Sequence, residues 1–414
     1  MDLKGAISAV RRHAEHRNKL VAIATSAALM GLIGAGTTAA RAEQPGDVGK
    51  PTYAYVGSYP NTSTSVAGDG NSIGISVFRF DPQIGTLTPV QQVHSAYPSW
   101  LTLAPSKRFL YACYALTGIG TNVSGSVEAY EINPHTGTLK FLNRVTQGIG
   151  SCAHAEVDPT GRHLIVSNYG YGNFAVLPID ANGRLDEISG VLQDFGYGPN
   201  PRQDTAHPHA ANFSPDGRFI GAADLGNDTV QTLRLQGGAL ARVSQTSVVA
   251  GTGPRHLAFS HDSKTLYMIG ELSGTITVFS YDPASGKIGQ TLQTLSIEPP
   301  GYAGVPAAGE IAVSPSGKFL YASDRGSQTI SSYRIDQSNG TLSLIGFVGQ
   351  GVNYPNNFVF DPSGKWLYVV NTHGNNIEQF SIDHDTGELT PHGQVTSINA
   401  PDMMVFRTPR QSHD

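Results

Sequence analysis

The stretch IAVSPSGKFLYASDR, residues 311–325, contains the repeat that decides the fold. A first apolar run ends at Ser314, a turn passes through Pro315 and Gly317, and a second apolar run begins at Phe319. Proline fixes φ near about −65° and glycine accepts a positive φ, so this turn closes a hairpin between two strands. Five other segments share the pattern, beginning at Leu101, Ala155, Ala211, Leu257 and Phe358.

The spacing of these turns predicts the architecture. Measured at the proline position, which His261 occupies in the fourth segment, successive hairpins are 54, 56, 46, 54 and 47 residues apart. Further short strands, such as TITVFSYD at 275–282, separate the hairpins. A period of about 50 residues with four antiparallel strands is typical of a β-propeller blade. Long polar inserts at 61–74, 196–209 and 298–306 are expected to be functional or mobile loops.

The two ends of the chain supply one more blade. YAYVGSY at 53–59 matches the second strand of the hairpin, and DMMVFRTP at 402–409 matches the first. A blade shared by the two ends closes the ring and leaves no long free edge. We therefore predict an all-β, seven-bladed β-propeller with four-stranded blades over residues 53–407, followed by a tail at 408–414.

Residues 1–42 have the pattern of an export signal. Basic residues, Arg11 and Arg12 among them, precede the apolar stretch 20–36, and small residues suited to cleavage follow. We expect a cleaved signal peptide, a linker at 43–52 and an exported protein, periplasmic or secreted, without stable membrane insertion; an uncleaved anchor is the alternative. The paired arginines leave both general and twin-arginine export open.

Composition limits the possible partners. A formal net charge of −5 provides no broad cationic surface for a nucleic-acid backbone, so we expect no nucleic-acid partner.

Only two cysteines are present, Cys113 and Cys152. In an oxidising compartment they are able to pair, and a buried free thiol is equally compatible with the sequence.

The repeat also serves as a ruler for locating a site. Residues just before the first strand of each hairpin and just after the second share one mouth of the channel. The first column, six positions before the proline position of each repeat, holds Ser99, Ala153, His209, Arg255, Gly309 and Asn356. The second column, ten positions after the proline position, holds Ala115, Tyr169, Leu225, Glu271, Arg325 and Thr372. The ruler thus brings His209, Arg255, Glu271 and Arg325 together. This cluster suits an anionic small molecule, although an Arg255–Glu271 pair that only seals the rim is the alternative.

Metal binding has weaker support. His207 and His209 form an H-x-H pair, but zinc would need a third ligand and only Glu271 is available, so we predict no metal. A further column of Asn and Asp, including Asp224 and Asp324, leaves calcium as the alternative, while hydrogen bonding to the next turn is preferred. His256 directly follows Arg255 and is expected to point the other way and pack between blades.

Several motifs in this order resemble the seven-bladed propeller lactonase family, which includes a bacterial type of 6-phosphogluconolactonase and fungal carboxymuconate cyclases. The motifs are HPHAANFSPDGRFIGAADLG from His207, GTGPRHLAFS from Gly251, AAGEIAVSPSGKFLYASDRG from Ala307 and PNNFVFDPSGKWLYVVNTHGN from Pro355. The resemblance covers nearly all of the propeller. It implies an enzyme acting on sugar-acid or muconate lactones, with His207 or His209, Arg255, Glu271 and Arg325 in the channel mouth.

One departure bears on the substrate. The last family motif reads Pro-Arg-Asn-Phe, and Asn356 here replaces an arginine that could bind a phosphate. This replacement and the expected export both argue against a phosphorylated substrate, and neither argues against lactone chemistry.

The predicted activity is therefore hydrolysis of a small sugar-acid-type lactone without a metal. Arg255 and Arg325 would hold the anionic group or the oxyanion, and Glu271 or His209 would be the general base. His207 and Asn356 would contact the substrate. The G-x-S-x-G match GNSIG, residues 70–74, lies in a polar insert and not at a strand-to-helix turn, so it does not predict a nucleophile elbow and a covalent serine route has no support. A non-catalytic binding propeller of the cell envelope and a lactone-forming cycloisomerase are the alternatives.

Overall fold

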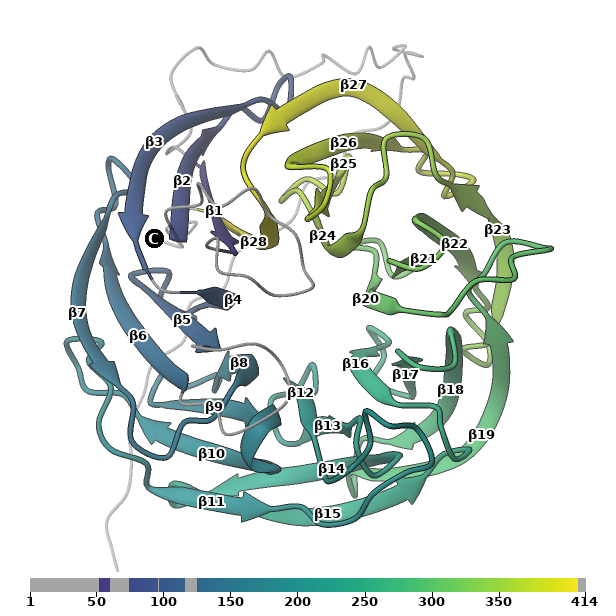
Figure 1. The fold of residues 1–414 in the computed structure, drawn as a ribbon, viewed down its shortest axis with the longest axis horizontal. Helices are drawn as coiled ribbons and strands as arrows, with labels where there is room; N and C mark the ends of the chain where they lie inside the picture. Colours follow the sequence, from purple (N-terminus) through teal and green to yellow (C-terminus); the bar gives the residue numbers. More distant parts are fainter. Residues whose placement is uncertain (1–51, 60–73, 96, 116–124, 409–414) are drawn as a thin grey trace, which may run out of the picture. The chain divides into compact units, whose positions relative to one another are not determined.

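The computed structural model describes residues 52–59, 74–95, 97–115 and 125–408, which form seven four-stranded antiparallel sheets in a ring (Figure 1). The predicted all-β, seven-bladed propeller is confirmed, since within these ranges the one helix is the short 3-10 turn η1 (Tyr169–Tyr171). The predicted signal peptide lies outside the described residues, as do nearly all of the linker and the tail, so those boundaries stay predictions.

Each blade runs from an inner strand at the channel to an outer strand at the rim. The first three blades, each from the inner strand outward, are β28 (Pro401–Arg407), β1 (Thr52–Ser58), β2 (Gly74–Phe80) and β3 (Leu87–His94); β4 (Pro98–Leu103), β5 (Phe109–Ala115), β6 (Gly125–Ile132) and β7 (Leu139–Val145); and β8 (Cys152–Val157), β9 (His163–Asn168), β10 (Asn173–Pro178) and β11 (Gly190–Gln193).

The remaining four blades follow the chain in the same way. They are β12 (Pro208–Phe213), β13 (Ile220–Asp224), β14 (Thr229–Gln236) and β15 (Ala239–Ser247); β16 (Pro254–Phe259), β17 (Thr265–Gly270), β18 (Thr275–Asp282) and β19 (Lys287–Ser296); β20 (Ala308–Val313), β21 (Phe319–Asp324), β22 (Thr329–Ile335) and β23 (Leu342–Val348); and β24 (Pro355–Phe360), β25 (Trp366–Asn371), β26 (Asn376–Ile382) and β27 (Leu389–Ser397). The pairing of β28 with β1 confirms that the two ends of the chain share a blade.

The hairpin turns have the backbone that the repeat predicts. Gly317 and Gly364 adopt φ values of 72°, in the left-handed region. Lys107 and Ser263 stand at the same turn position in the two repeats that lack glycine, and both adopt a φ of 57°. The turn therefore keeps its shape where a side chain makes that shape less favourable, because the two flanking strands are paired and buried.

A β-bulge recurs near the start of the inner strand in every blade. In the fifth blade Pro254 pairs with Gly270 and His256 with Ile269, which leaves Arg255 without a partner in the ladder. The skipped residues are Ser99, Ala153, His209, Arg255, Gly309 with Glu310, Asn356 and Asp402. Six of these are the first column of the sequence ruler. A bulge re-aims side chains, so the column marks a structural device that points residues into the channel.

The hydrophobic core lies between neighbouring blades, where second and third strands pack face to face. Buried tyrosines on the second strands of five blades add a repeated polar tie, because each hydroxyl donates to a glycine carbonyl in a turn of the next blade. The pairs are Tyr55 with Gly137, Tyr111 with Gly183, Tyr267 with Gly340, Tyr321 with Gly387 and Tyr368 with Gly85. These ties hold the blades in register around the channel.

The two cysteines are paired. Cys113 on β5 and Cys152 at the start of β8 form a disulfide between adjacent blades, with their Cα atoms 5.7 Å apart. The sequence left this pairing open, because the two residues are 39 positions apart and only the packing of the two blades brings them together. Within the described ranges, no helix is long and apolar enough to cross a membrane.

Candidate active site

A cavity lies in the channel where the inner strands begin, and all seven blades contribute to its wall. Its lining residues are Tyr59, Tyr97, Ser99, Trp100, Ser151, Cys152, Ala153, Tyr169, Arg202, His209, Arg255, His256, Glu271, Arg325, Asn356, Asn357, Asp402 and Met403. The four residues that the sequence ruler grouped, His209, Arg255, Glu271 and Arg325, are all among them.

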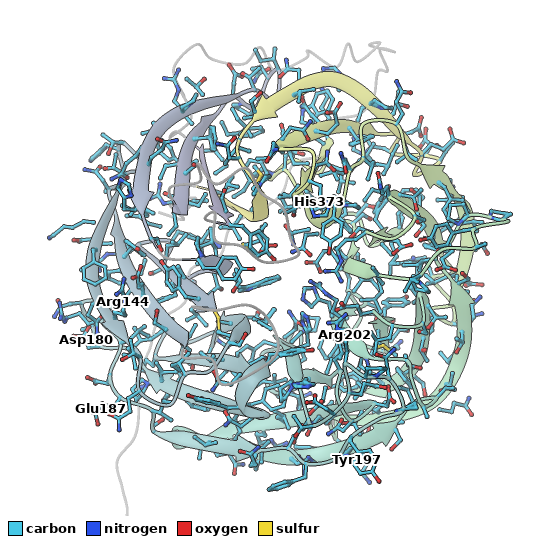
Figure 2. All side chains as sticks on the ribbon, viewed as in Figure 1. Arg144, Asp180, Glu187, Tyr197, Arg202 and His373 are labelled. Carbon is cyan, nitrogen blue, oxygen red and sulfur yellow. A yellow bond between two sulfur atoms is a disulfide. The ribbon has the colours of Figure 1, made fainter. Side chains whose placement is uncertain are left out.

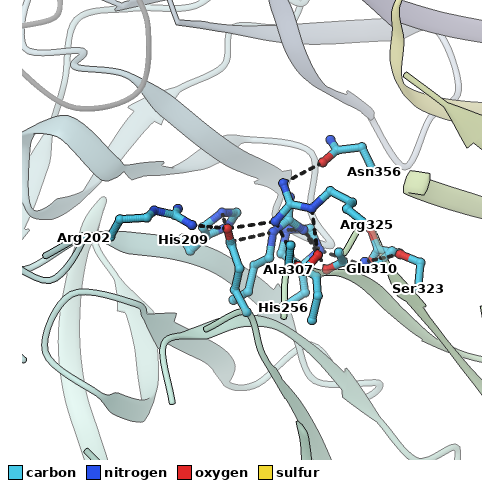
Figure 3. A network of polar contacts seen from close by, with 12 residues as sticks. Arg202, His209, His256, Ala307, Glu310, Ser323, Arg325 and Asn356 are labelled. Carbon is cyan, nitrogen blue, oxygen red and sulfur yellow. Dashed lines mark hydrogen bonds and ion pairs between the residues drawn. The ribbon is translucent and has the colours of Figure 1, made fainter. Parts of the chain in front are cut away.

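Glu271 is the centre of the charged cluster, since it contacts Arg202, His209 and Arg325. Figure 3 shows these three side chains pointing toward one another. Glu271 follows β17, is 3% exposed, and its carboxylate contacts the Nη1 of Arg202 at 2.5 Å, the Nη2 of Arg325 at 2.8 Å and the Nε of Arg255 at 3.1 Å. Burial alone would raise the pKa of this carboxyl, but the three guanidinium groups outweigh burial and hold its pKa well below the usual range. Glu271 is therefore ionised, and both of its oxygens are occupied by arginine.

The two buried arginines are held by further acceptors. Arg325 donates from Nε to the carbonyl of Ala307, from Nη1 to Asn356 and from Nη2 to the carbonyl of Ala308. Arg255 donates from Nη1 to the carbonyl of Gly309 at 2.7 Å. Fixed guanidinium groups of this kind are preorganised to stabilise negative charge. They have few N–H groups left over for a ligand that needs many donors.

Arg202 is a site residue that sequence reasoning missed. It belongs to the insert 196–209, and its side chain is 43% exposed where it contacts Glu271. Figure 2 shows Arg202 beside the central opening, whereas Tyr197 of the same insert lies at the outer edge. The length of the insert was a signal for function, but nothing in the sequence indicated which of its residues reaches the channel.

His209 is buried and neutral at pH 7. Burial, together with the positive charge of Arg255, lowers its pKa well below the ordinary value, and Glu271 opposes this shift only in part. The Nε2 atom lies 3.8 Å from the Glu271 carboxylate, and Nδ1 has no hydrogen-bond partner in the described structure. A neutral imidazole with a free ring nitrogen is able to accept a proton.

The expected orientation of His256 is wrong. This residue lines the cavity, and its ring lies 5.2 Å from the ring of His209 and 5.2 Å from that of Trp100. The bulge at Arg255 breaks the alternation of the strand, so two consecutive side chains both face the channel. His256 also contacts Glu310 of the next blade at 3.0 Å, so it ties blades together from within the cavity.

His207 and Asn356 have different surroundings. His207 is outside the cavity lining: Nδ1 contacts the carbonyl of Tyr169 at 2.9 Å, Nε2 contacts Asp204 at 2.9 Å, and its ring stacks on Tyr169. Both ring nitrogens are thus occupied by the protein. Asn356 lines the cavity, where it accepts from Arg325 and donates to Asp402. Direct substrate contact remains a prediction for both residues.

Asp402 is a second carboxyl that the sequence ruler did not select. It lines the cavity, is 2% exposed, accepts from Asn356 and is hydrogen-bonded to Tyr59. Burial raises its pKa to about 7, although Tyr59, Arg255 and Arg325 partly oppose this shift. Counted from Pro409, the proline that follows this strand, the ruler would have selected Met403, so only the bulge of the closing blade identifies Asp402.

The column of Asn and Asp residues confirms the preferred turn interpretation. The Oδ1 atom of Asp224 accepts from the backbone N–H groups of His207 and Gly226, and Asp324 binds the backbone of Ala307 and Gly326 in the same way. These oxygens therefore organise the turns above the second strands. In the part of the chain that the structure describes, no group of three or more His, Cys, Asp or Glu residues could hold a metal. The prediction of metal-independent chemistry remains untested.

The chain resembles known proteins over almost its whole propeller. Residues 53–406 match the family described as "Lactonase, 7-bladed beta-propeller". The chain is 30% identical to a 6-phosphogluconolactonase of Bacillus subtilis over 73% of this chain and 82% of that protein, and 33% identical to a 6-phosphogluconolactonase of Formosa agariphila over 66% and 78%. A solved periplasmic gluconolactonase of Pseudomonas aeruginosa is 29% identical, with a TM-score of 0.79 and coverage of 86% of this chain and 99% of that one.

The fold and the site together define a class, a seven-bladed β-propeller with an arginine–glutamate–histidine cluster in its channel. The extent of the family match settles membership within that class. The chain belongs to the seven-bladed β-propeller lactonase family, which confirms the resemblance seen in the sequence motifs.

Proposed function

We propose that this protein hydrolyses a small, unphosphorylated sugar-acid-type lactone in the channel cavity. The observation that carries the proposal is the combination of a neutral, buried His209 with guanidinium groups fixed around one carboxylate. The activities for which its relatives are named support the lactone class, and one of these relatives is a gluconolactonase.

In the proposed mechanism Arg255 and Arg325 stabilise the oxyanion that forms when water attacks the lactone carbonyl. His209 accepts the proton of that water. The bond between the carbonyl carbon and the ring oxygen then breaks, and the ring oxygen takes a proton to become the hydroxyl of the product acid. Glu271 orients the arginines and does not act as the base, because three guanidinium groups occupy it and keep its pKa low.

The donor count supports an unphosphorylated substrate. A phosphate offers three acceptor oxygens and about two negative charges. All three nitrogens of Arg325 already donate to protein oxygens, and Asn356 supplies no charge. Among the three arginines that line the cavity, Arg202 has the most exposed side chain, at 43%, and one such cation suits a neutral lactone or one carboxylate.

Export is part of the same proposal. The disulfide between Cys113 and Cys152 is compatible with an oxidising compartment, and one structural relative is periplasmic. We propose that the mature protein works in the periplasm or outside the cell, without a metal cofactor.

The direct test is an assay of the purified mature chain against glucono-1,5-lactone and its 6-phosphate, with and without EDTA, in which proton release is followed and the spontaneous rate is subtracted. We expect turnover of glucono-1,5-lactone, a kcat/KM at least tenfold lower for the phosphate, and no effect of EDTA. A lack of turnover for both would favour the binding-propeller alternative. Turnover lost in EDTA and restored by calcium would contradict the metal-independent mechanism.

A further inference from the structure

In the closing blade, the residue that the inner-strand bulge skips is the acidic Asp402. Pro401 pairs with Ser58 and Met403 with Gly57, so Asp402 is skipped in β28 in the same way as Arg255 is skipped in β16. Since the bulge directs the skipped side chain into the channel, Asp402 faces the same cavity as His209. Figure 1 shows their strands, β28 and β12, on opposite sides of the central opening, with β4 and β8 between them along one side of the ring.

Asp402 and Glu271 are buried carboxyls with opposite surroundings. Glu271 contacts three arginines, whereas Asp402 makes no ion pair within 4 Å among the described residues. The groups that act on Asp402 are the hydroxyl of Tyr59, the amide of Asn356 and the more distant charges of Arg255 and Arg325. The adjoining inner strand β4 presents the neutral Ser99 to the cavity, and Tyr97 packs against the Tyr59 ring.

Two carboxyls in one cavity whose environments separate their protonation states are able to take different roles. Glu271 stays charged at every working pH. Burial without an ion pair raises the pKa of Asp402 to about 7, so a large share of the molecules carry its proton near neutral pH. The arginine cluster and Asp402 thus face the same substrate, one side offering fixed positive charge and the other a transferable proton.

We propose that Asp402 is the general acid of the lactone hydrolysis, protonating the ring oxygen as the lactone opens. This assignment rests on the proposed function. Water attacks the carbonyl carbon and gives a proton to His209, the bond from that carbon to the ring oxygen breaks, and the proton of Asp402 passes to that oxygen. The product is the open hydroxy acid, which ionises. His209 returns its proton to Asp402 through solvent, so the net reaction consumes one water and releases one proton.

The role predicts a particular pH profile. A general acid must be protonated before transfer, so kcat should fall as the pH rises through the Asp402 pKa, near 7. Asp402→Asn should lower kcat by about 10²- to 10⁴-fold, because an amide has no acidic proton to give. It should also abolish the fall of kcat at high pH, which is the basic limb of the profile. A merely structural role would lower the rate by the same factor at every pH.

Two further variants make the test decisive. Tyr59→Phe removes a hydrogen bond that lowers the Asp402 pKa, so the basic limb should move to higher pH. Glu156→Gln is the matched control: Glu156 on β8 is partly buried and its pKa is also raised to about 7, but it accepts hydrogen bonds from Asn212 and the backbone of Phe213 and lies outside the cavity lining. That variant should keep both the wild-type kcat and the wild-type fall of kcat at high pH.

The experiment measures kcat and KM for glucono-1,5-lactone from pH 5 to 9 for these four proteins, together with an infrared titration of the protonated carboxyl band. The expected result is that the carboxyl band that titrates near pH 7 loses one component in Asp402→Asn and its other component, from Glu156, in Glu156→Gln. Retention of the wild-type kcat and basic limb by Asp402→Asn would overturn the acid role alone. If that variant does not fold, an unmoved limb in Tyr59→Phe overturns it. A wild-type protein that opens no lactone would overturn the proposed function and the acid role together.

Discussion

Replacing Glu271 by glutamine tests the central cluster most sharply. Glutamine keeps the size of the side chain but removes the charge, and its amide places an N–H donor against guanidinium groups. Arg255 and Arg325, whose side chains are 7% and 10% exposed, would then be buried without their counter-ion. An uncompensated buried charge is costly because it is removed from water without electrostatic compensation.

The expected loss follows from these contacts. Removing one partner of a buried ion pair costs about 3–5 kcal/mol in the free energy of unfolding. The contact with Arg202 adds at most about 1 kcal/mol, since solvent screens that partly exposed side chain. Glu271 has a lowered pKa, so its contribution is complete above its ordinary pKa of 4.5 and is lost as the pH falls through the lower folded value. The difference between wild type and variant should therefore be full at pH 7 and shrink in acid.

Urea unfolding at pH 7, followed by tryptophan fluorescence, measures this difference, and the lactone assay measures the rate. We expect Glu271→Gln to lower kcat/KM by about 100-fold or more, because the arginines lose the carboxylate that orients them. Glu131→Gln is the control, since its pair with Lys140 is on the surface and should be worth about 0–1 kcal/mol. A Glu271→Gln variant within 1 kcal/mol of wild type that also kept the wild-type rate would refute the reasoning.

Three further predictions concern single features of the site and the fold. His209→Gln should lower kcat by about 10²- to 10⁴-fold with little change in KM, and steady-state kinetics that showed the reverse would exclude the base role. Arg202→Ala should raise KM for a carboxylated lactone more than for glucono-1,5-lactone, which a comparison of the two substrates checks. Replacing both Cys113 and Cys152 by serine should lower the free energy of unfolding by about 2–4 kcal/mol in the urea assay, because the bridge closes a long loop.

Much of the fold follows from the sequence because a propeller repeats the same four-stranded blade, and each blade contains the same kind of hairpin. The Pro and Gly present in most of the hairpin turns specify backbone angles through their own covalent structure, and the spacing of six such hairpins leaves few other architectures. The ruler also located His209, Arg255, Glu271 and Arg325, since the bulge before each turn and the end of the second strand after it recur at fixed distances from that turn. Equal spacing from a repeated turn implies equal placement around the ring.

Other features depend on packing between segments that no repeat relates. Arg202 reaches Glu271 from an irregular insert, and Cys113 meets Cys152 only because two blades lie side by side. His256 faces the cavity against the alternation of a regular strand, because the bulge at Arg255 disturbs it. Linear spacing carries no information about such contacts.

The choice of acid and base also belongs to the tertiary structure. The sequence identified four ionisable residues that reach the channel, His209, Arg255, Glu271 and Arg325, and by itself it left Glu271 and His209 as equal candidates for the base. Three arginines keep Glu271 ionised, while burial keeps His209 neutral and leaves Asp402 partly protonated. A pKa is set by the charges and the solvent within a few ångströms of a group, and these are known only once the seven blades are assembled around the channel.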